Sequence, residues 1–171
     1  ASAVTAGASR LIALITDAWK PQVNGVVRTL TTLDDRLRSL GHLVKVIQPG
    51  LFTSIPMPGY AEIRLSVWPD GKVRRLLDAF EPEHIHIATE GPIGLLVRRY
   101  CKKHRLPVTT SFHTRLPDSV SARLPIPESV VWAVLRWFRR PSRATMAATP
   151  ALAQELRDRG FADVVLWPRG V

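Results

Sequence analysis

Several residues that could bind a ligand stand directly after short apolar segments of the sequence. Asn24-Gly25 closes a loop that follows the apolar residues 11–15. An Asn-Gly pair can adopt positive φ angles and lets a ligand approach the backbone closely. If a helix begins at this pair, its free N–H groups and its dipole favour a phosphate group. A plain tight turn is the alternative interpretation of the same two residues.

Two further side chains with useful chemistry occupy equivalent positions. His113 follows the expected strand 107–112, where an imidazole could donate to a sugar hydroxyl or to an oxyanion. Glu90 follows another such segment and could accept hydrogen bonds from a polyol or cap the next helix. Arg115 could hold an anionic acceptor. A structural role for the histidine and a surface ion pair for the arginine are the alternatives.

A metal site is a second chemical interpretation of the histidines. His84 and His86 would point to one face of a strand, and Glu90 or His113 could complete the ligand set. Two histidines two residues apart do not define a metal site by themselves, and we predict none. A metal-dependent hydrolase built on these residues stays an alternative function.

Alternating strands and helices are expected to position these residues. Apolar runs predict strands, and apolar residues at helical spacing predict the helices between them. The expected strands are 11–15, 43–47, 63–67, 84–87, 107–112, 144–148 and 164–167; the expected helices are 26–40, 70–80, 93–104, 128–139 and 150–159. Residues 51–62 are expected to form a loop, and residues 113–127 an irregular stretch.

This alternation predicts an α/β fold with a Rossmann-like, mostly parallel sheet and helices on both faces. Ligands of such folds bind beyond the carboxyl ends of the strands, near a topological switch point. The segments 16–25, 89–91, 113–115 and 149–150 are therefore where function is expected.

Length and composition limit the class of protein. The chain has 171 residues, the size of one domain, and 46% of them are hydrophobic. The single cysteine excludes an internal disulfide framework. No apolar run approaches the roughly 18–20 residues that span a bilayer. The small, uncharged residues 1–9 do not resemble a signal peptide and are expected to form a disordered tail. These features predict a cytoplasmic enzyme.

Positive charge is concentrated in the second half of the chain. Residues 1–90 hold 10 basic and 9 acidic side chains, whereas residues 91–171 hold 14 and 5. Like charges lie four residues apart on the expected helix 93–104, which is unfavourable unless an anion is near. We expect contact with an anionic membrane surface, and a helix 128–139 packed into the core is the alternative. The candidate contact residues are Arg98, Arg99, Lys102, Lys103, Arg136, Arg139 and Arg140.

Together, these segments resemble the first half of retaining GT-B glycosyltransferases of family 4. The similarity covers nearly the whole chain after Ser9 and is closest to bacterial mannosyltransferases and glycolipid synthases. The motifs that carry it are Thr16-Asp17, 21–27, Leu40-Gly41-His42, 81–86, Phe112-His113-Thr114, Ala148-Thr149-Pro150 and 167–171. Two departures are Asn24, where the family often has glycine, and Arg169, where asparagine is common.

The resemblance implies that residues 10–171 form the N-terminal, acceptor-side domain. In this family a C-terminal domain with an E-x7-E motif holds most of the nucleotide-sugar, and residues 1–171 contain no such motif. We therefore expect the isolated chain to be inactive. By position, Asn24 and Gly25 would face the donor pyrophosphate and His113 would contact the transferred sugar as the catalytic residue. Asp17, Glu90 and Arg115 would contact the acceptor.

The expected partners follow from the same resemblance. A GDP- or UDP-linked sugar, with mannose as one candidate, would be the donor substrate, and no separate cofactor is expected. The acceptor would be a sugar, a lipid or a glycolipid, at the inner face of the plasma membrane if the basic surface binds lipid. A basic, non-catalytic module that binds nucleic acid is a competing class, although no recognisable nucleic-acid-binding motif is present, and we expect no nucleic-acid partner.

Overall fold

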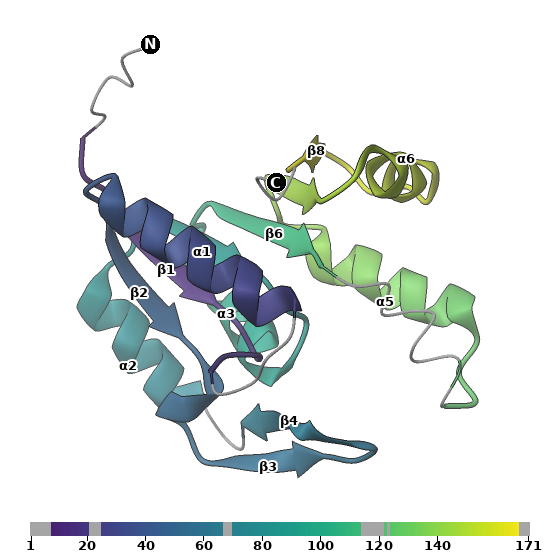
Figure 1. Ribbon diagram of the computed structural model, residues 1–171, viewed down its shortest axis with the longest axis horizontal. Helices are drawn as coiled ribbons and strands as arrows, with labels where there is room; N and C mark the ends of the chain where they lie inside the picture. The colour runs from purple at the N-terminus through teal and green to yellow at the C-terminus, as the bar shows by residue number, and fades with distance from the viewer. Residues whose placement is uncertain (1–7, 21–24, 67–69, 114–121, 123, 168–171) are drawn as a thin grey trace.

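The computed structural model describes residues 8–20, 25–66, 70–113, 122 and 124–167 (Figure 1). Its apolar runs form the parallel strands β1 (Leu11–Ile15), β2 (Leu43–Ile47), β5 (His84–Ile87), β6 (Val108–Phe112), β7 (Ala144–Ala147) and β8 (Val164–Leu166). Its amphipathic segments form the helices α1 (Gly25–Ser39), α2 (Asp70–Phe80), α3 (Pro92–His104), α5 (Glu128–Arg139) and α6 (Pro150–Asp158). A short 3-10 helix, η1, spans Pro49–Leu51.

Within the described residues, the main sheet has the strand order β2-β1-β5-β6-β7-β8. The chain moves from β1 outward to β2 and then returns to place β5 on the other side of β1. The strand order therefore reverses between β1 and β5, and a fold of this kind binds ligands at that reversal. The loops after β1, β5 and β6 leave the sheet at the same edge because all three strands are parallel.

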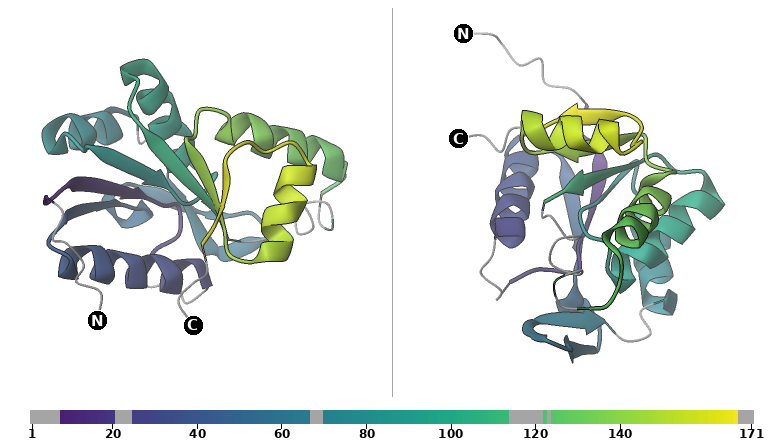
Figure 2. Two further views of the ribbon diagram at one scale, coloured as in Figure 1. Left: turned by 90° about the horizontal axis from the view of Figure 1, so that it is seen from above. Right: turned by 90° about the vertical axis from the view of Figure 1, so that its right-hand side faces the viewer.

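Helices cover both faces of the sheet, as the sequence predicts. Figure 2 shows α1 along one face and α2 and α3 along the other. On the α1 side, Ile12, Leu14 and Val44 pack together with Leu33 and Leu37. The opposite side holds a larger cluster of buried residues from β1, β5, α2 and α3, and a third cluster joins β6 and β7 to α5 and α6. The parallel α/β architecture is confirmed.

The segment between β2 and α2 differs from the prediction. We expected residues 51–62 to form a loop, but the strands β3 (Ser54–Met57) and β4 (Tyr60–Ser66) pair as an antiparallel hairpin. Gly59, with φ +80°, lies in the turn. The prolines were misleading because an isolated two-stranded ribbon has only edge strands, and edge strands tolerate proline. This hairpin forms a sheet of its own.

The chain termini are only partly described. Residues 1–7 of the expected disordered tail lie outside the described residues. Ser9 is held in place, since its hydroxyl donates to the carbonyl oxygen of Gly41 at 2.7 Å.

Gly41 itself follows α1 with φ +87°, which is the left-handed conformation expected of the glycine that ends a helix.

Candidate functional site

The Asp17 carboxylate, at the end of β1, binds the first turn of α3. It accepts the backbone N–H of Ile93 at 2.9 Å and that of Gly94 at 3.3 Å. The hydroxyl of Thr89 donates to the same carboxylate at 2.8 Å and accepts the Asp17 N–H at 2.6 Å. A carboxylate in this position satisfies free N–H groups and interacts favourably with the helix dipole.

The burial of Asp17 changes how this residue is interpreted. It is 6% exposed, and burial raises the pKa of its carboxyl, although the backbone hydrogen bonds of Ile93 and Gly94 and the side-chain bond of Thr89 oppose that shift. The structure therefore assigns the carboxylate to joining the loops after β1 and β5. The predicted contact between Asp17 and an acceptor is not what this geometry shows, because α3 already occupies both carboxylate oxygens.

A row of histidines and hydroxyls leads along β5 and β6 to the carboxyl edge of the sheet. The two strands pair in parallel with His86 opposite Thr109, so the odd-numbered polar residues of β6 face the histidines of β5. Nδ1 of His86 lies 2.8 Å from Oγ1 of Thr109, and its Nε2 lies 3.0 Å from Oγ of Ser111. The same Ser111 oxygen lies 2.5 Å from Nε2 of His113.

This row gives His113 a fixed hydrogen-bond partner. His86 is 5% exposed, and burial, followed by the charges of His113 and His84, lowers its pKa to about 3. His86 is therefore neutral at physiological pH, and one ring nitrogen donates while the other accepts. Ser111 connects this buried neutral ring to the half-buried imidazole of His113 at the sheet edge.

Trp167 stands beside the same two imidazoles. Its ring centroid is 6.1 Å from that of His86 and 6.1 Å from that of His113, with edge-to-face interplanar angles of 82° and 71°. Such arrangements are favourable for aromatic rings. Trp167 follows β8, so a residue far along the chain completes the packing around His113.

Glu90 is committed to an ion pair. Its Oε1 accepts a hydrogen bond from Nη2 of Arg139, whose side chain is 3% exposed, while the Glu90 side chain is 23% exposed. The same Nη2 also donates to the carbonyl oxygen of Ser111 at 3.2 Å. Burial lowers the pKa of Arg139 to about 9. Glu90 thus reaches the surface at the carboxyl edge while anchoring the end of α5.

The remaining predicted ligand contacts are only partly described. Gly25 is the first residue of α1 and is exposed, as a phosphate contact at a helix N-terminus requires. β5 separates β1 from β6, so the ends of β1 and β6 lie about 10 Å apart at the usual strand spacing. Asn24 and Arg115 lie outside the described residues, and their roles stay predictions.

The basic residues divide into buried and exposed groups. We expected Arg98 and Arg139 to contact an anionic surface, but they are 5% and 4% exposed, so this part of the prediction is wrong. Arg98 donates to the carbonyl oxygens of Phe138 at 2.8 Å and of Trp137 at 2.9 Å. These carbonyls belong to the last turn of α5, where unpaired oxygens attract a cation. Exposed positions are held by Arg99, Lys102, Lys103, Arg136 and Arg140.

The metal-dependent alternative gains no support from the geometry. Both ring nitrogens of His86 are engaged by hydroxyls, and Glu90 is paired with Arg139. Across residues 8–20, 25–66, 70–113 and 124–167, no three histidine, cysteine or acidic side chains are grouped to hold a metal ion. None of the helices described is both long and apolar enough to cross a bilayer.

The sequence did not reveal the hydrogen-bonded row or the Glu90–Arg139 pair. The available signal was the alternation of His84 and His86 on one strand with Thr109 and Ser111 on another. Such matching polar alternation on neighbouring strands indicates a polar stripe across the sheet. The register between the strands was unknown, so the same histidines left a metal site open as an alternative interpretation.

Comparison with known proteins identifies the family. Residues 23–171 match the sequence model of the protein family described as Glycosyltransferase Family 4. A GDP-mannose-dependent alpha-mannosyltransferase of Mycobacterium tuberculosis is 25% identical over 94% of this chain and 47% of its own length. The enzyme of the same name from Corynebacterium glutamicum is 24% identical over 94% of this chain and 43% of its own length.

Relatives of a second kind are named for a different activity. An alpha-monoglucosyldiacylglycerol synthase of Acholeplasma laidlawii is 30% identical over 63% of this chain and 30% of its own length. The chain spans about half the length of the mannosyltransferases that it matches. The model match covers most of the chain, and the parallel α/β architecture is that expected for half of a GT-B fold. The chain therefore belongs to glycosyltransferase family 4.

Proposed function

We propose that this chain forms the acceptor-side half of a retaining glycosyltransferase that moves a sugar from a nucleotide-sugar to an acceptor. The observation that supports this most is the position of His113. Its imidazole stands at the carboxyl end of β6 and is held by Ser111, close to the point where the strand order reverses. A side chain fixed in this way can donate to a substrate oxygen without reorganising during the reaction.

The donor diphosphate is proposed to meet the start of α1. Gly25 carries no side chain to block a ligand, and the helix dipole favours negative charge at this end. Departure of a nucleotide diphosphate creates negative charge, so stabilising it lowers the barrier. GDP-mannose is the donor we propose, because relatives that cover nearly the whole chain are named for its use. A second domain would supply the remaining donor contacts.

The two carboxylates at the carboxyl edge of the sheet, Asp17 and Glu90, are consistent with a mechanism in which this chain supplies no nucleophilic carboxylate. Asp17 is buried against α3, and Glu90 is paired with Arg139. A glycosidase needs two carboxyl groups, one that acts on the sugar and one that acts as the acid. The contacts of Asp17 with α3 and of Glu90 with Arg139 do not suit these two residues to act as such a pair. Glu90 remains the proposed acceptor contact because its side chain is partly exposed.

Stereochemistry provides the test of this proposal. The enzyme that contains this chain is incubated with GDP-mannose and a lipid extract, and the anomeric configuration of the product is determined by NMR. Retention of the α configuration is the expected result. An inverted product, or the absence of transfer from every GDP- and UDP-linked sugar supplied, would contradict the proposal.

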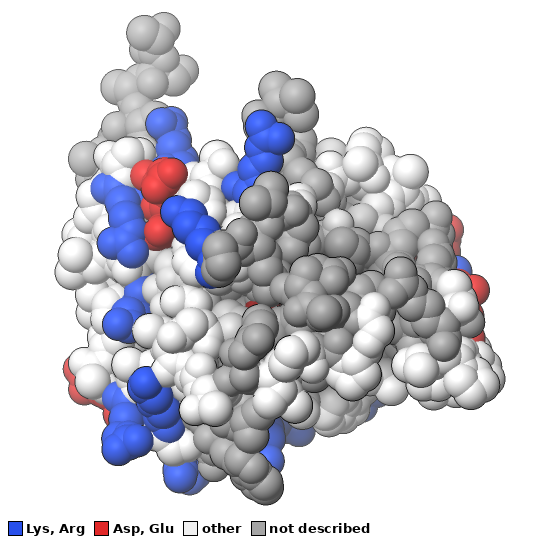
Figure 3. Space-filling view, turned by 60° about the horizontal axis from the view of Figure 1, so that its bottom comes forward, with Lys and Arg blue, Asp and Glu red and all other residues white. Residues whose placement is uncertain are grey.

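We also propose that the chain attaches peripherally to an anionic membrane at the cytoplasmic face. The exposed side of α5 carries Val130, Val134 and Trp137, which are 49%, 54% and 46% exposed. Arg136 and Arg140 are exposed at the C-terminal end of the same helix. An apolar stripe bordered by arginines suits the boundary between headgroups and acyl chains. On the face drawn in Figure 3, by contrast, the described Lys and Arg side chains form separate groups.

Vesicle binding tests this attachment with a matched pair of variants. Val134→Glu should weaken sedimentation with vesicles of phosphatidylglycerol and phosphatidylcholine at low salt, because it places a carboxylate in the apolar stripe. Leu40→Glu is the control, since Leu40 is 46% exposed beyond the end of α1. Equal binding by both variants would place the membrane contact elsewhere, and no binding by the unmodified chain would refute the attachment.

A further inference from the structure

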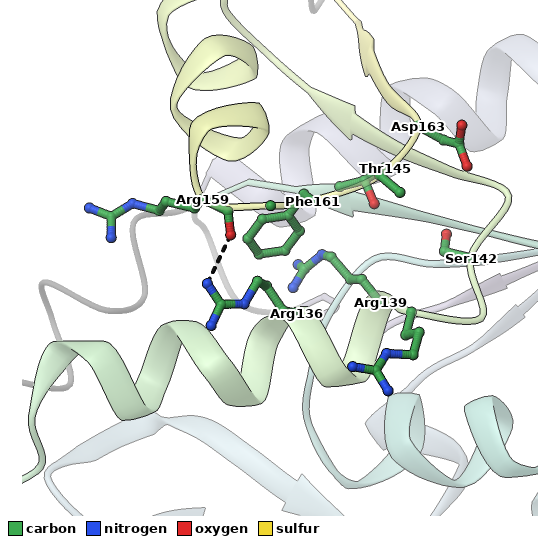
Figure 4. A pocket seen from close by; sticks show the side chains of 10 residues that line it. Arg136, Arg139, Ser142, Thr145, Arg159, Phe161 and Asp163 are labelled. Atoms are coloured by element: carbon green, nitrogen blue, oxygen red, sulfur yellow. Dashed lines mark hydrogen bonds between the residues drawn. The ribbon is translucent and has the colours of Figure 1, made fainter.

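Four arginines line a pocket toward the amino-terminal ends of the last strands of the sheet. The pocket has a volume of about 400 Å³ and lies between the end of α5, the start of β7 and the connection from α6 to β8 (Figure 4). Ser142 precedes β7 and Asp163 precedes β8, so these lining residues mark the amino-terminal ends of the strands. We call this the arginine pocket; its cationic lining residues are Arg136, Arg139, Arg140 and Arg159.

The buried guanidinium of Arg139 has unused hydrogen-bonding capacity. Its Nη2 binds Glu90 and the carbonyl oxygen of Ser111. Its Nε and Nη1 are buried and have no hydrogen-bond partner among the described residues. Leaving a charged buried donor unpaired is costly, so such groups in proteins usually meet a ligand, an ion or water. Arg139 also lines the arginine pocket, although its two unpaired nitrogens lie below the accessible surface.

The other arginines are held in position around the same space. The Arg159 guanidinium lies 4.0 Å from the centroid of the Trp132 ring and 3.2 Å from a carboxylate oxygen of Glu155. Nη1 of Arg136 donates to the carbonyl oxygen of Arg159 at 2.8 Å, which ties α5 to the end of α6. Side chains restrained in this way lose little conformational freedom when a ligand binds.

The charge of the lining favours an anion. Four arginines line the arginine pocket, and Asp163 is its one acidic lining residue within the described part of the chain. Ion pairs with Glu90 and Glu155 offset the charges of Arg139 and Arg159, so Arg136 and Arg140 contribute most of the positive charge. Arg140 also lies close enough to Arg98 to lower the pKa of that guanidinium, although burial contributes more. Guanidinium groups recognise phosphate oxygens through paired N–H donors, which suits them to this class of ligand.

We propose that the arginine pocket binds a phosphate-bearing anion through the exposed side chains of Arg136 and Arg140, with the buried charge of Arg139 beneath them. The pocket lies toward the amino ends of β7 and β8, whereas His113 follows the carboxyl end of β6. Arg139 connects the two regions, because its Nη2 contacts Glu90 and the carbonyl oxygen of Ser111. The anion can be a soluble phosphorylated compound or a lipid headgroup, which present the same oxygens.

Inorganic pyrophosphate is the first probe, measured by titration calorimetry on the purified chain at low salt. Arg140→Gln removes one exposed cation from the pocket mouth and should weaken binding roughly tenfold, the usual effect of losing one charge-assisted contact. Arg99→Gln is the control because Arg99 is an exposed arginine on α3 outside the pocket. Absence of pyrophosphate binding, or an equal loss in both variants, would overturn the proposal.

Two further measurements keep the outcome interpretable. Arg136→Gln, checked for folding by circular dichroism, should weaken pyrophosphate binding as well, and unchanged affinity in a folded Arg136→Gln protein would refute the assignment. Vesicles containing phosphatidylinositol phosphate distinguish the two sources of the anion. Vesicle binding that pyrophosphate displaces identifies a headgroup, and pyrophosphate binding without any competition by vesicles identifies a soluble ligand.

Discussion

Replacing Asp17 with alanine should destabilise the fold because the Asp17 carboxylate is structural. The substitution removes the acceptor of two buried backbone N–H groups, those of Ile93 and Gly94, and of the Thr89 hydroxyl. Each buried donor left without a partner costs about 1–3 kcal/mol. The unfavourable burial that raises the pKa of Asp17 is relieved in the variant and offsets part of this cost. We therefore expect Asp17→Ala to lower the free energy of unfolding by about 2–4 kcal/mol.

Urea unfolding monitored by tryptophan fluorescence measures this change. Asp158→Ala is the matched control, since Asp158 is exposed and accepts one hydrogen bond, from Gln154 at 2.8 Å. It should change the free energy of unfolding by less than about 0.5 kcal/mol. If Asp17→Ala unfolds at the same urea concentration as the unmodified chain but weakens acceptor binding, Asp17 is a ligand contact and our assignment is wrong.

Two other substitutions test the packing and electrostatics of the same region. The pKa of His86, lowered to about 3, means that between about pH 6.5 and 3 the unfolded chain binds a proton that the folded chain does not, so the free energy of unfolding falls with falling pH. His86→Gln should therefore lower the acid-side slope by up to about 1.4 kcal/mol per pH unit in urea titrations, and an unchanged slope would contradict the burial of a neutral imidazole. Gly94→Ala places a methyl group against the carbonyl oxygen of Thr89, whereas Gly71→Ala meets no atom within 4 Å. Thermal denaturation should show a lower midpoint for Gly94→Ala only, and equal midpoints would indicate that α3 shifts freely.

The sequence was sufficient to predict the main sheet because its strands are short segments, several of them apolar, that alternate with helical patterns. Residues 11–15 are all apolar, as a strand buried on both faces must be, and residues 43–47 are apolar except for Lys45. The hairpin β3–β4 escaped prediction because its prolines and its turn glycine are equally typical of an irregular loop. A hairpin differs from an irregular loop in the pairing between its two strands, and local composition does not reveal that pairing.

The site was predicted less completely because its contacts depend on strand register and helix packing. The position of His113 after a strand was visible in the sequence, but its partner Ser111 and the buried His86 were recognisable only once β5 and β6 were paired. Arg98 was expected at the surface from its charge. It is buried because the carbonyl oxygens at the end of α5 satisfy its donors, which is a tertiary contact between segments 40 residues apart.

The effect of His113→Ala on catalysis and on folding tests the central claim most directly. Turnover and the free energy of unfolding are measured on the same preparation of the enzyme that contains this chain. We predict that kcat falls at least about 100-fold, as when a preorganised donor to the reacting group is lost, while the free energy of unfolding changes by less than about 1 kcal/mol. A variant that unfolds readily, or one that transfers sugar at the normal rate, would show that the imidazole serves the fold and not the reaction.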